Sequence, residues 1–214
     1  MDPSQETFDK AMMRRCIELS RAAIEENEYP YGTVITLDGK IIAESTNHTV
    51  RDDDVSRHAE VNALAEARRK LCRHDLARAT LYTNVEPCAM CSFCIREAWV
   101  GRVVFGLHSP VMGGFSKWTI LRDQDLSDRI PIFGPAPEIV SGFLCNEVQE
   151  VWRGWNPMAW EMIKLRGLFS AQAQCDEGVK VLPARAKTFL QHITFTVMKL
   201  GRIGVKRTNQ KTPA

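Results

Sequence analysis

The sequence predicts an α/β protein in which helices cover both faces of a central sheet, a three-layer α-β-α sandwich. The first observation is the order of the predicted elements, because strands alternate with helices along the first half of the chain. The second is the dipeptide Asp38-Gly39 between two β-rich runs, which is a strong signal for a two-residue hairpin. The third is an apolar spacing of three and four residues in the segments between strands, which is typical of amphipathic helices.

The first elements each follow from a local pattern. Residues 7–26 predict a helix, since apolar side chains recur on one face at Phe8, Met12, Cys16, Leu19 and Ala23. Residues 33–46 hold the two strands of the hairpin. Residues 58–72 are rich in helix formers and carry a second apolar stripe, so they predict another helix.

The following elements continue the alternation. Residues 79–84 (ATLYTN) and 102–106 (RVVFG) predict strands, and Pro87 suits the first turn of a helix over about 88–98. A further strand is expected over 138–144 and a helix over 157–168. Residues 107–137 predict a loop, because they contain four prolines and a Gly-Gly pair.

The composition is that of a globular protein with one sizeable core. The chain has 214 residues, of which 44% are hydrophobic and 25% charged. We expect a domain over 1–150 and a helical extension with a basic tail over 151–214. No apolar stretch is long enough to span a bilayer, and the polar start does not resemble a secretory leader. Seven irregularly spaced cysteines indicate reduced thiols, so a cytoplasmic location is expected.

Charge is distributed unevenly along the chain. Residues 178–214 hold eight Lys or Arg and no acid, whereas 1–177 hold 20 basic and 26 acidic residues, a net charge of −6. The acidic body disfavours a nucleic-acid partner, although the basic tail favours one. We interpret the tail as a helix that packs on a neighbouring subunit. An RNA-contacting arm and adhesion to an anionic membrane surface are the alternatives.

Three cysteines at three-residue intervals follow Pro87. The spacing of Cys88, Cys91 and Cys94 alone fits a metal site, an iron–sulfur cluster, a redox pair or small core residues. The two-residue gap between Cys88 and Cys91 lets both sulfurs reach one ion, and His58 stands thirty residues upstream at a predicted helix start. One imidazole and two thiolates fill three positions of tetrahedral Zn²⁺ and leave the fourth for water.

Glu60, two residues after His58, can lie beside the ion without binding it, which suits a proton shuttle. A His-x-Glu followed by Pro-Cys-x-x-Cys is the signature of zinc nucleobase deaminases, and the sequence resembles the cytidine/deoxycytidylate deaminase superfamily. It is most similar to the branch that contains guanine deaminases, cytosine deaminases and bacterial tRNA adenosine deaminases. The resemblance spans about 7–145 and includes YPYGTVI at 29–35, HAEVNAL at 58–64, TNVEPCAMC at 83–91 and GRVVFG at 101–106.

The resemblance implies a mixed sheet of about five strands and a homodimer. It implies Zn²⁺ bound by His58, Cys88 and Cys91, with Glu60 as the general acid and base. Asn47 occupies the position of an asparagine that contacts the substrate in relatives, with a turn residue at a strand end as the alternative interpretation.

The activity that the resemblance implies is hydrolytic deamination with release of ammonia. Zinc-bound hydroxide attacks the amino-bearing ring carbon, and Glu60 shuttles the protons. We expect the substrate to be a free nucleobase, a nucleoside or a similar small aminated heterocycle. One alternative is a tRNA adenosine deaminase that converts adenosine to inosine. The other is a catalytically silent deaminase-like subunit that binds RNA, against which the presence of Glu60 argues.

Two further features concern the pocket rim and the third cysteine. Within 107–118, Phe115 and Trp118 are candidates for stacking on the bound base, with core packing as an equal alternative. Cys94 lies one helical turn beyond Cys91, so a helix carries it about 4.5 Å further along the axis. We interpret Cys94 as a small buried apolar residue rather than a ligand.

Overall fold

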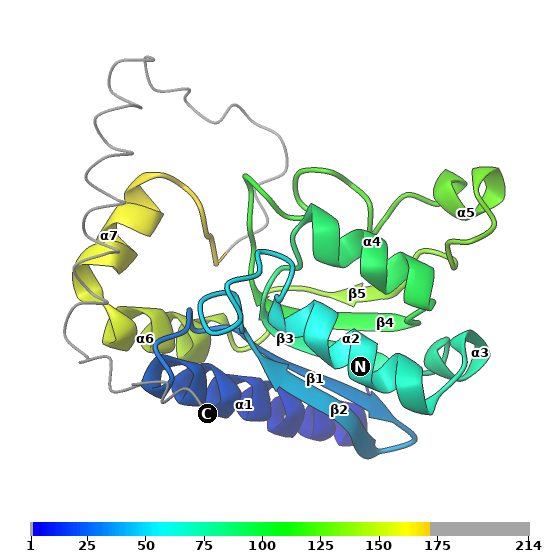
Figure 1. Ribbon diagram of the computed structural model, residues 1–214, viewed down its shortest axis with the longest axis horizontal. Helices are drawn as coiled ribbons and strands as arrows, with labels where there is room; N and C mark the ends of the chain where they lie inside the picture. The colour runs from blue at the N-terminus through cyan, green and yellow to red at the C-terminus, as the bar shows by residue number, and fades with distance from the viewer. Residues whose placement is uncertain (1, 172–214) are drawn as a thin grey trace, which may run out of the picture.

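A five-stranded mixed sheet lies at the centre of the structure, a computed structural model that describes residues 2–171 (Figure 1). Its strands are β1 (Gly32–Leu37), β2 (Lys40–Thr46), β3 (Thr80–Val85), β4 (Arg102–Leu107) and β5 (Glu138–Val140). The strand order is β2-β1-β3-β4-β5. Strand β1 is antiparallel to β2 and β3, whereas β4 is parallel to β3 and β5.

Helices cover both faces of this sheet (Figure 1). Those within the described residues are α1 (Pro3–Glu25), α2 (Ala59–Lys70), α3 (Arg73–Leu76), α4 (Ala89–Ala98), α5 (Asp125–Arg129), α6 (Cys145–Trp155) and α7 (Pro157–Leu165). Helices α1, α6 and α7 contribute to the core on one face, and α2 and α4 to the core on the other. The predicted three-layer α-β-α sandwich is confirmed.

The two cores follow from the alternation of side chains along the strands. Successive residues of a strand point to opposite faces of the sheet. Tyr82 of β3 and Val104 of β4 lie in the core beneath α1, whereas their neighbours Leu81 and Val103 lie in the core beneath α2 and α4. Both strands are buried over nearly their whole length, as expected for strands that helices cover on both faces.

The strand expected over 138–144 is shorter than predicted. Only its first three residues form β5, because Gly142 has a φ of 72° and Leu144 a φ of 51°, and these left-handed values end an extended segment. Helix α6, which the sequence did not predict, begins at the next residue. Its buried positions nevertheless recur at helical spacing, at Val148, Val151 and Trp152.

Two predicted helices have different ends in the structure. The helix expected over 7–26 begins earlier as α1, because the Asp2 side chain accepts a hydrogen bond from the Ser4 amide and caps the first turn. The helix expected over 157–168 ends earlier as α7, because Gly167 has a φ of 62° and closes the helix as a C-terminal glycine does.

The topology brings the starts of α2 and α4 together. Strands β3 and β4 are parallel and adjacent, and α4 begins four residues after β3 ends. Helix α2 follows β2, which points the same way as β3 because both are antiparallel to β1. Helix α2 also packs against α4 on the same face of the sheet. Side chains at these two helix starts therefore meet near the carboxyl ends of the parallel strands, which is where α/β sheets place their ligand sites.

The segment after residue 150 shares a core with the residues before it. Residue 150 lies inside α6, and Trp160, Ile163 and Phe169 belong to the same apolar cluster as Met13 of α1. The predicted basic tail lies outside the described residues, so the division of the chain at residue 150 stays a prediction. No helix within residues 2–171 is both long and apolar enough to cross a membrane.

A buried ion pair joins α1 to β4. The Asp9 carboxylate, which has no exposed surface, accepts hydrogen bonds from the Arg102 guanidinium at 2.9 and 2.7 Å and from the Tyr82 hydroxyl at 2.7 Å. Burial raises the pKa of Asp9, but hydrogen bonds from Arg102, Tyr82 and Gln5 outweigh burial and hold the pKa below its ordinary value of 3.8. Asp9 therefore stabilises the fold as a carboxylate.

We expect Asp9→Ala to lower the free energy of unfolding by about 3–5 kcal/mol, because it leaves the Arg102 charge without its buried partner. Asp9 contributes fully at pH values above the ordinary carboxyl pKa, and the contribution is lost as pH falls through the lowered folded-state pKa. Urea unfolding of both proteins at neutral and at acidic pH measures this, and the difference between them should shrink in acid. Glu147→Ala, which removes an exposed partner of Arg14, is the control and should cost less than about 1 kcal/mol.

Candidate functional site

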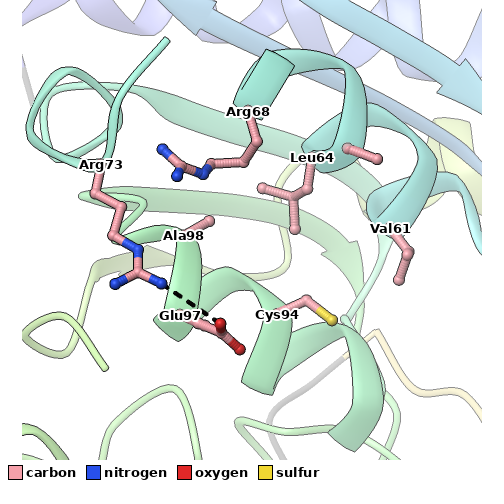
Figure 2. Close-up of a pocket in the computed structure, with 8 residues that line it drawn as sticks. Val61, Leu64, Arg68, Arg73, Cys94, Glu97 and Ala98 are labelled. Carbon is pink, nitrogen blue, oxygen red and sulfur yellow. Dashed lines mark hydrogen bonds and ion pairs between the residues drawn. The ribbon is translucent and has the colours of Figure 1, made fainter. Parts of the chain in front are cut away.

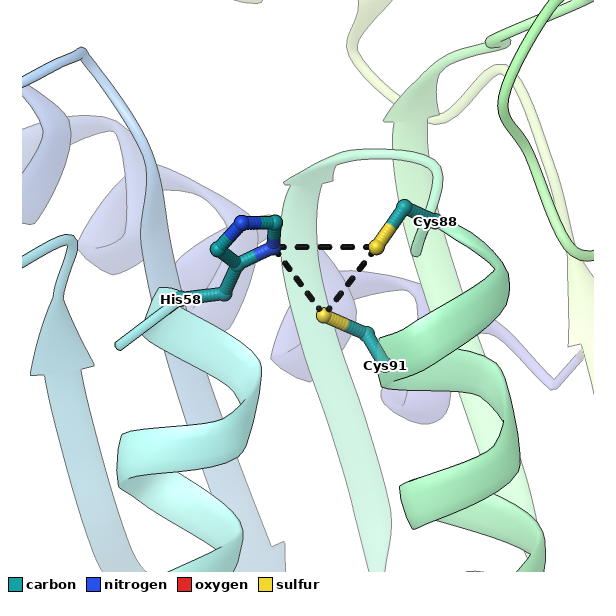
Figure 3. A group of neighbouring side chains, drawn as sticks. All are labelled: His58, Cys88 and Cys91. Atoms are coloured by element: carbon teal, nitrogen blue, oxygen red, sulfur yellow. Dashed lines mark hydrogen bonds between the residues drawn. The ribbon is translucent and has the colours of Figure 1, made fainter. Parts of the chain in front are cut away.

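The three predicted ligand residues meet at the starts of two helices. Figure 3 shows His58, at the start of α2, facing Cys88 and Cys91 at the start of α4. His58 Nδ1 lies 3.6 Å from Cys88 Sγ and 3.4 Å from Cys91 Sγ, and the two sulfurs are 3.6 Å apart. His58 and Cys88 are the N-cap residues of helices that pack together, which explains how residues 30 positions apart become neighbours.

These distances fit one tetrahedral ion. With Zn–S bonds of about 2.3 Å and Zn–N bonds of about 2.0 Å, tetrahedral geometry places two sulfurs about 3.8 Å apart and a sulfur and a nitrogen about 3.5 Å apart. The observed distances of 3.6 Å between sulfurs and of 3.4 and 3.6 Å between sulfur and nitrogen agree with these values. One imidazole and two thiolates also leave one tetrahedral position open, so the residues fit a zinc ion that can bind water.

The two cysteines carry opposite pKa shifts. A hydrogen bond from the Cys91 thiol, together with His58 and against the effect of burial, lowers the pKa of Cys88 to about 4. The same interaction with Cys88 raises the pKa of Cys91 well above its ordinary value. The pair therefore holds one thiolate beside one thiol, at a distance that also suits a shared cation. Binding of the cation releases the remaining proton, because metal ligands are deprotonated.

Glu60 lies beside this cluster in the first turn of α2. It is 6% exposed, and burial followed by the charge of Cys88 raises its pKa to about 7. A carboxyl group with a pKa near neutrality can both accept and release a proton. Within the described residues, the ligand atoms of His58, Cys88 and Cys91 lie close enough together to share an ion, and Glu60 does not belong to that group.

A cavity of about 410 Å³ opens beside His58. Tyr29, Tyr31 and Asn47 line it from the segments that flank β1 and β2. Trp152 of α6, Ile163 of α7 and Phe169 line it from the C-terminal part of the described chain. Of the described residues that line this cavity, none is Lys, Arg, Asp or Glu, so its walls are largely apolar and aromatic.

The orientation of Asn47 is fixed by a buried acid. Its Nδ2 donates hydrogen bonds to Glu28 Oε2 at 2.9 Å and to Thr49 Oγ1 at 2.7 Å. Glu28 also accepts from the backbone amides of Val50 and Arg51 and so holds the whole turn. Because a carboxylate only accepts hydrogen bonds, the amide nitrogen of Asn47 must face Glu28, and Oδ1 is the atom left to accept a bond at the cavity.

The structure does not bring the two predicted stacking residues to the cavity. Phe115 is half-buried in the core under α4, where its ring centre lies 5.9 Å from that of Phe105. Its backbone amide donates to the buried carboxylate of Glu86 at 2.9 Å, which keeps this part of the chain turned inward. Trp118 is 56% exposed, and neither residue is among the described residues that line the cavity.

Cys94 lies apart from the three ligand residues. Figure 2 shows it beside a separate groove of about 210 Å³ between α2 and α4, with Arg68 and Glu97 among the other residues that line this groove. Cys94 is half-buried and packs against the core under these helices, and burial raises the pKa of its thiol. It is a partly buried small side chain rather than a fully buried one.

Known proteins are similar to this chain in sequence and in fold. Residues 6–107 match the cytidine and deoxycytidylate deaminase zinc-binding region. A tRNA-specific adenosine deaminase of Agrobacterium fabrum is 34% identical over 134 residues, which make up 63% of this chain and 84% of that protein. The chain belongs to the cytidine deaminase superfamily. It is therefore a zinc-binding deaminase, and zinc is its cofactor.

Two further relatives of this deaminase support the assignment. A probable cytosine deaminase of Schizosaccharomyces pombe is 38% identical over 101 residues, which make up 47% of this chain and 61% of the relative. A solved structure from a study of A-to-I editing by tRNA:A34 deaminases is 31% identical, with a TM-score of 0.53. The similarity covers 62% of this chain and 98% of that structure. The predicted superfamily and fold are thus confirmed.

One wall of the deaminase cavity lies beyond the family match, which ends at residue 107. Trp152, Ile163 and Phe169 are not predicted as site residues by the sequence. No local signal distinguishes them, because apolar residues at helical spacing look alike whether they face a core or a cavity. Tyr29 and Tyr31 stand in the YPYG segment that the resemblance covers, and that segment could have drawn attention to them.

Proposed function

We propose that this deaminase hydrolyses the amino group of a free nucleobase, a nucleoside or a similar small aminated heterocycle. The observation that carries the proposal is the cavity beside His58, with aromatic and apolar walls and no Lys or Arg among the described residues that line it. Such walls suit a flat, uncharged ring. They offer no cationic side chain to a phosphate group, and proteins use such side chains to hold nucleotides and nucleic acids.

His58, Cys88 and Cys91 would hold the zinc ion. When bound, zinc lowers the pKa of a coordinated water to about 7 and so supplies hydroxide at neutral pH. Two helix N-termini flank the three ligands, because His58 and Cys88 occupy the N-cap positions of α2 and α4. Their backbone amides favour negative charge on the thiolates and on oxygen at this place.

Glu60 is the proposed general acid and base. Its carboxylate takes a proton from the attacking water and passes it to the ring nitrogen next to the amino-bearing carbon, while the oxygen adds to that carbon. Glu60 then moves the second proton to the amino group, the C–N bond breaks, and ammonia leaves as the carbonyl forms. One water is consumed and one ammonia released per turnover, without any change of oxidation state.

Asn47 is the proposed orienting residue. Glu28 and Thr49 occupy both of its donor hydrogens, so Asn47 offers an acceptor to the substrate. A ring N–H or a sugar hydroxyl would satisfy this acceptor. A substrate that presents only hydrogen-bond acceptors to Asn47 would leave the buried Oδ1 atom without a donor. The unpaired oxygen would weaken the binding of such a substrate.

Deamination of adenosine in tRNA is the second candidate function. The relative from Agrobacterium fabrum favours it. Against it, residues 2–171 hold 20 basic and 24 acidic residues, a net charge of −4 that does not attract a polyanion. A catalytically silent RNA-binding subunit is the third candidate. The presence of Glu60 argues against a catalytically silent protein, because a carboxylate at this position is needed for proton transfer but not for binding zinc.

Ammonia release from a panel of bases, nucleosides and anticodon stem–loops tests the proposal. We expect turnover with at least one small heterocycle, and little change in its rate as salt rises, because the cavity does not recognise phosphate. Turnover confined to stem–loops, with a steep loss at higher salt, would support the tRNA candidate instead. Zinc-loaded protein that releases no ammonia from any of them would support the silent subunit.

We also propose that the protein acts as a homodimer in the cytoplasm. Support comes from α4, where Met90 is 37% exposed and Phe93, one turn further on the same helix face, is 43% exposed. Neighbouring exposed apolar side chains of this size are typical of interaction surfaces. The net negative charge of residues 2–171 disfavours a nucleic-acid partner.

A further inference from the structure

Glu86 is a buried carboxylate that the proposed reaction does not use. Its side chain has no exposed surface, and the residue directly follows β3, two positions before Cys88. Oε1 accepts hydrogen bonds from the backbone amides of Phe115 at 2.9 Å and Ser116 at 2.6 Å. Oε2 accepts from the Ser109 amide at 2.8 Å and the Ser116 hydroxyl at 2.6 Å. Four donors from one loop, residues 108–116, therefore converge on a single carboxylate.

The 108–116 loop contacts the start of α4 directly. Gly113 forms a β-bridge with Cys88, and the Met112 carbonyl accepts a hydrogen bond from the Ala89 amide at 3.1 Å. Met112 also lines the cavity. The position of this loop thus determines where the backbone of Cys88 lies and where one side of the cavity lies.

Two glycines allow the loop to approach so closely. A Cβ on Gly113 would overlap the Glu86 carboxylate, and a Cβ on Gly114 would overlap the Ser92 side chain of α4. Glycine is the residue that permits such close contact. The contact between Glu86 and the loop therefore depends on the carboxylate of Glu86 and on the two glycines of the loop.

The same loop also contacts the segment that carries Phe169, another residue lining the cavity. The backbone of His108 exchanges two hydrogen bonds with Ser170, at 2.8 and 3.0 Å. The His108 Nδ1 atom lies 3.7 Å from Glu86 Oε2 and 3.3 Å from the hydroxyl of Ser116. Ser170 follows Phe169, which lines the cavity and packs against Trp152 with ring centres 4.9 Å apart.

We propose that Glu86 is a positioning residue for the metal centre and for the cavity. By holding the 108–116 loop, it fixes Cys88 at the start of α4 and, through His108, Phe169 at the cavity wall. Glu86 acts through these residues and not by binding zinc. The part of the inference that concerns Phe169 rests on the proposed function, whereas the part that concerns Cys88 requires only that the site binds a metal.

Glu86→Gln tests this inference. The amide keeps the shape of the carboxylate but replaces one acceptor oxygen with an NH₂ group, which then faces donors from the loop. We expect zinc affinity, measured by competition with a chromophoric chelator, to fall by about 10- to 100-fold, as for other groups that orient metal ligands. In the cobalt-substituted protein, we expect the thiolate-to-metal absorption to shift or weaken, and KM for a small substrate to rise more than kcat falls.

Glu97→Gln is the matched control. It makes the same substitution on α4 itself, at a side chain that is 51% exposed and pairs with Arg73. We expect its zinc affinity, cobalt spectrum and KM to match the wild type. Ser116→Ala removes a single donor to Glu86 and should weaken zinc binding in the same direction as Glu86→Gln, but less.

Wild-type zinc affinity and cobalt spectrum in Glu86→Gln would overturn the inference, even if its thermal stability fell, because Glu86 would then only support the fold. If Glu86→Gln does not fold, Ser116→Ala decides, and unchanged zinc affinity in that variant overturns the inference. The metal measurements do not depend on the substrate. A protein that deaminates nothing but loses zinc on Glu86→Gln would therefore reject the proposed function and leave the role of Glu86 toward Cys88 standing.

Discussion

Glu60→Gln is expected to bind zinc as the wild type does and to lose kcat by about 10²- to 10⁴-fold, the contribution typical of a positioned general acid and base. Glu60 is not needed to complete the ligand set, since His58, Cys88 and Cys91 already converge at 3.4–3.6 Å. The amide has nearly the same size but cannot take a proton from water or return it to the leaving group. Metal analysis and ammonia release on the same preparation measure both quantities.

Glu66→Gln is the matched control for this prediction. It lies further along the same helix, α2, where its exposed carboxylate pairs with Lys70 at 2.6 Å. The same chemical change there should leave both zinc content and kcat at the wild-type level. Full turnover by zinc-loaded Glu60→Gln would refute the role assigned to Glu60. Loss of zinc from that variant would instead mean that the carboxylate helps to hold the ion.

The convergence of the three candidate ligands could be predicted from the sequence because it depends largely on local geometry. His58 and Cys88 are each the N-cap residue of a helix, and the helical pattern that follows each of them is a short-range signal. Pro87 lies one position before the N-cap residue and not in the first helical turn, where the sequence predicted it. A two-residue gap then fixes Cys91 relative to Cys88 once the helix forms. The two helix starts meet because β2, which precedes α2, and β3, which precedes α4, are both antiparallel to β1 and therefore point the same way.

The cavity could not be predicted in the same way, because its walls are set by contacts distant in the chain. Phe169 reaches the cavity through the bridge between His108 and Ser170, a pairing across 62 positions that no local pattern records. For Phe115 the sequence allowed stacking at the pocket rim and core packing equally, and the side chain lies against the core, where Glu86 binds its backbone amide. In both cases a buried backbone contact determines where the side chain lies. The periodicity of apolar residues along the chain does not indicate such a contact.

Cys91→Ala is expected to lose stoichiometric zinc and all measurable turnover, whereas Cys94→Ala, one helical turn further along α4, should keep both. Cys91 is fully buried with its sulfur 3.4 Å from His58 Nδ1, so its removal leaves two ligands for an ion that needs at least three from the protein. Cys94 lines a different groove and belongs to no group that can share an ion within the described residues. The pair of variants therefore separates loss of a ligand from loss of a half-buried thiol on the same helix.

Thermal unfolding with and without a chelator gives this pair a readout that needs no substrate. A ligand that binds only the folded state raises the midpoint of unfolding, so removal of zinc should lower Tm of the wild type and of Cys94→Ala. The Tm of Cys91→Ala should not respond to the chelator, because that variant holds no ion to remove. If the chelator lowers the Tm of Cys91→Ala, or fails to lower the Tm of Cys94→Ala, the ion is bound by a different set of sulfurs. The ligand set would then no longer imply an open coordination position beside Glu60.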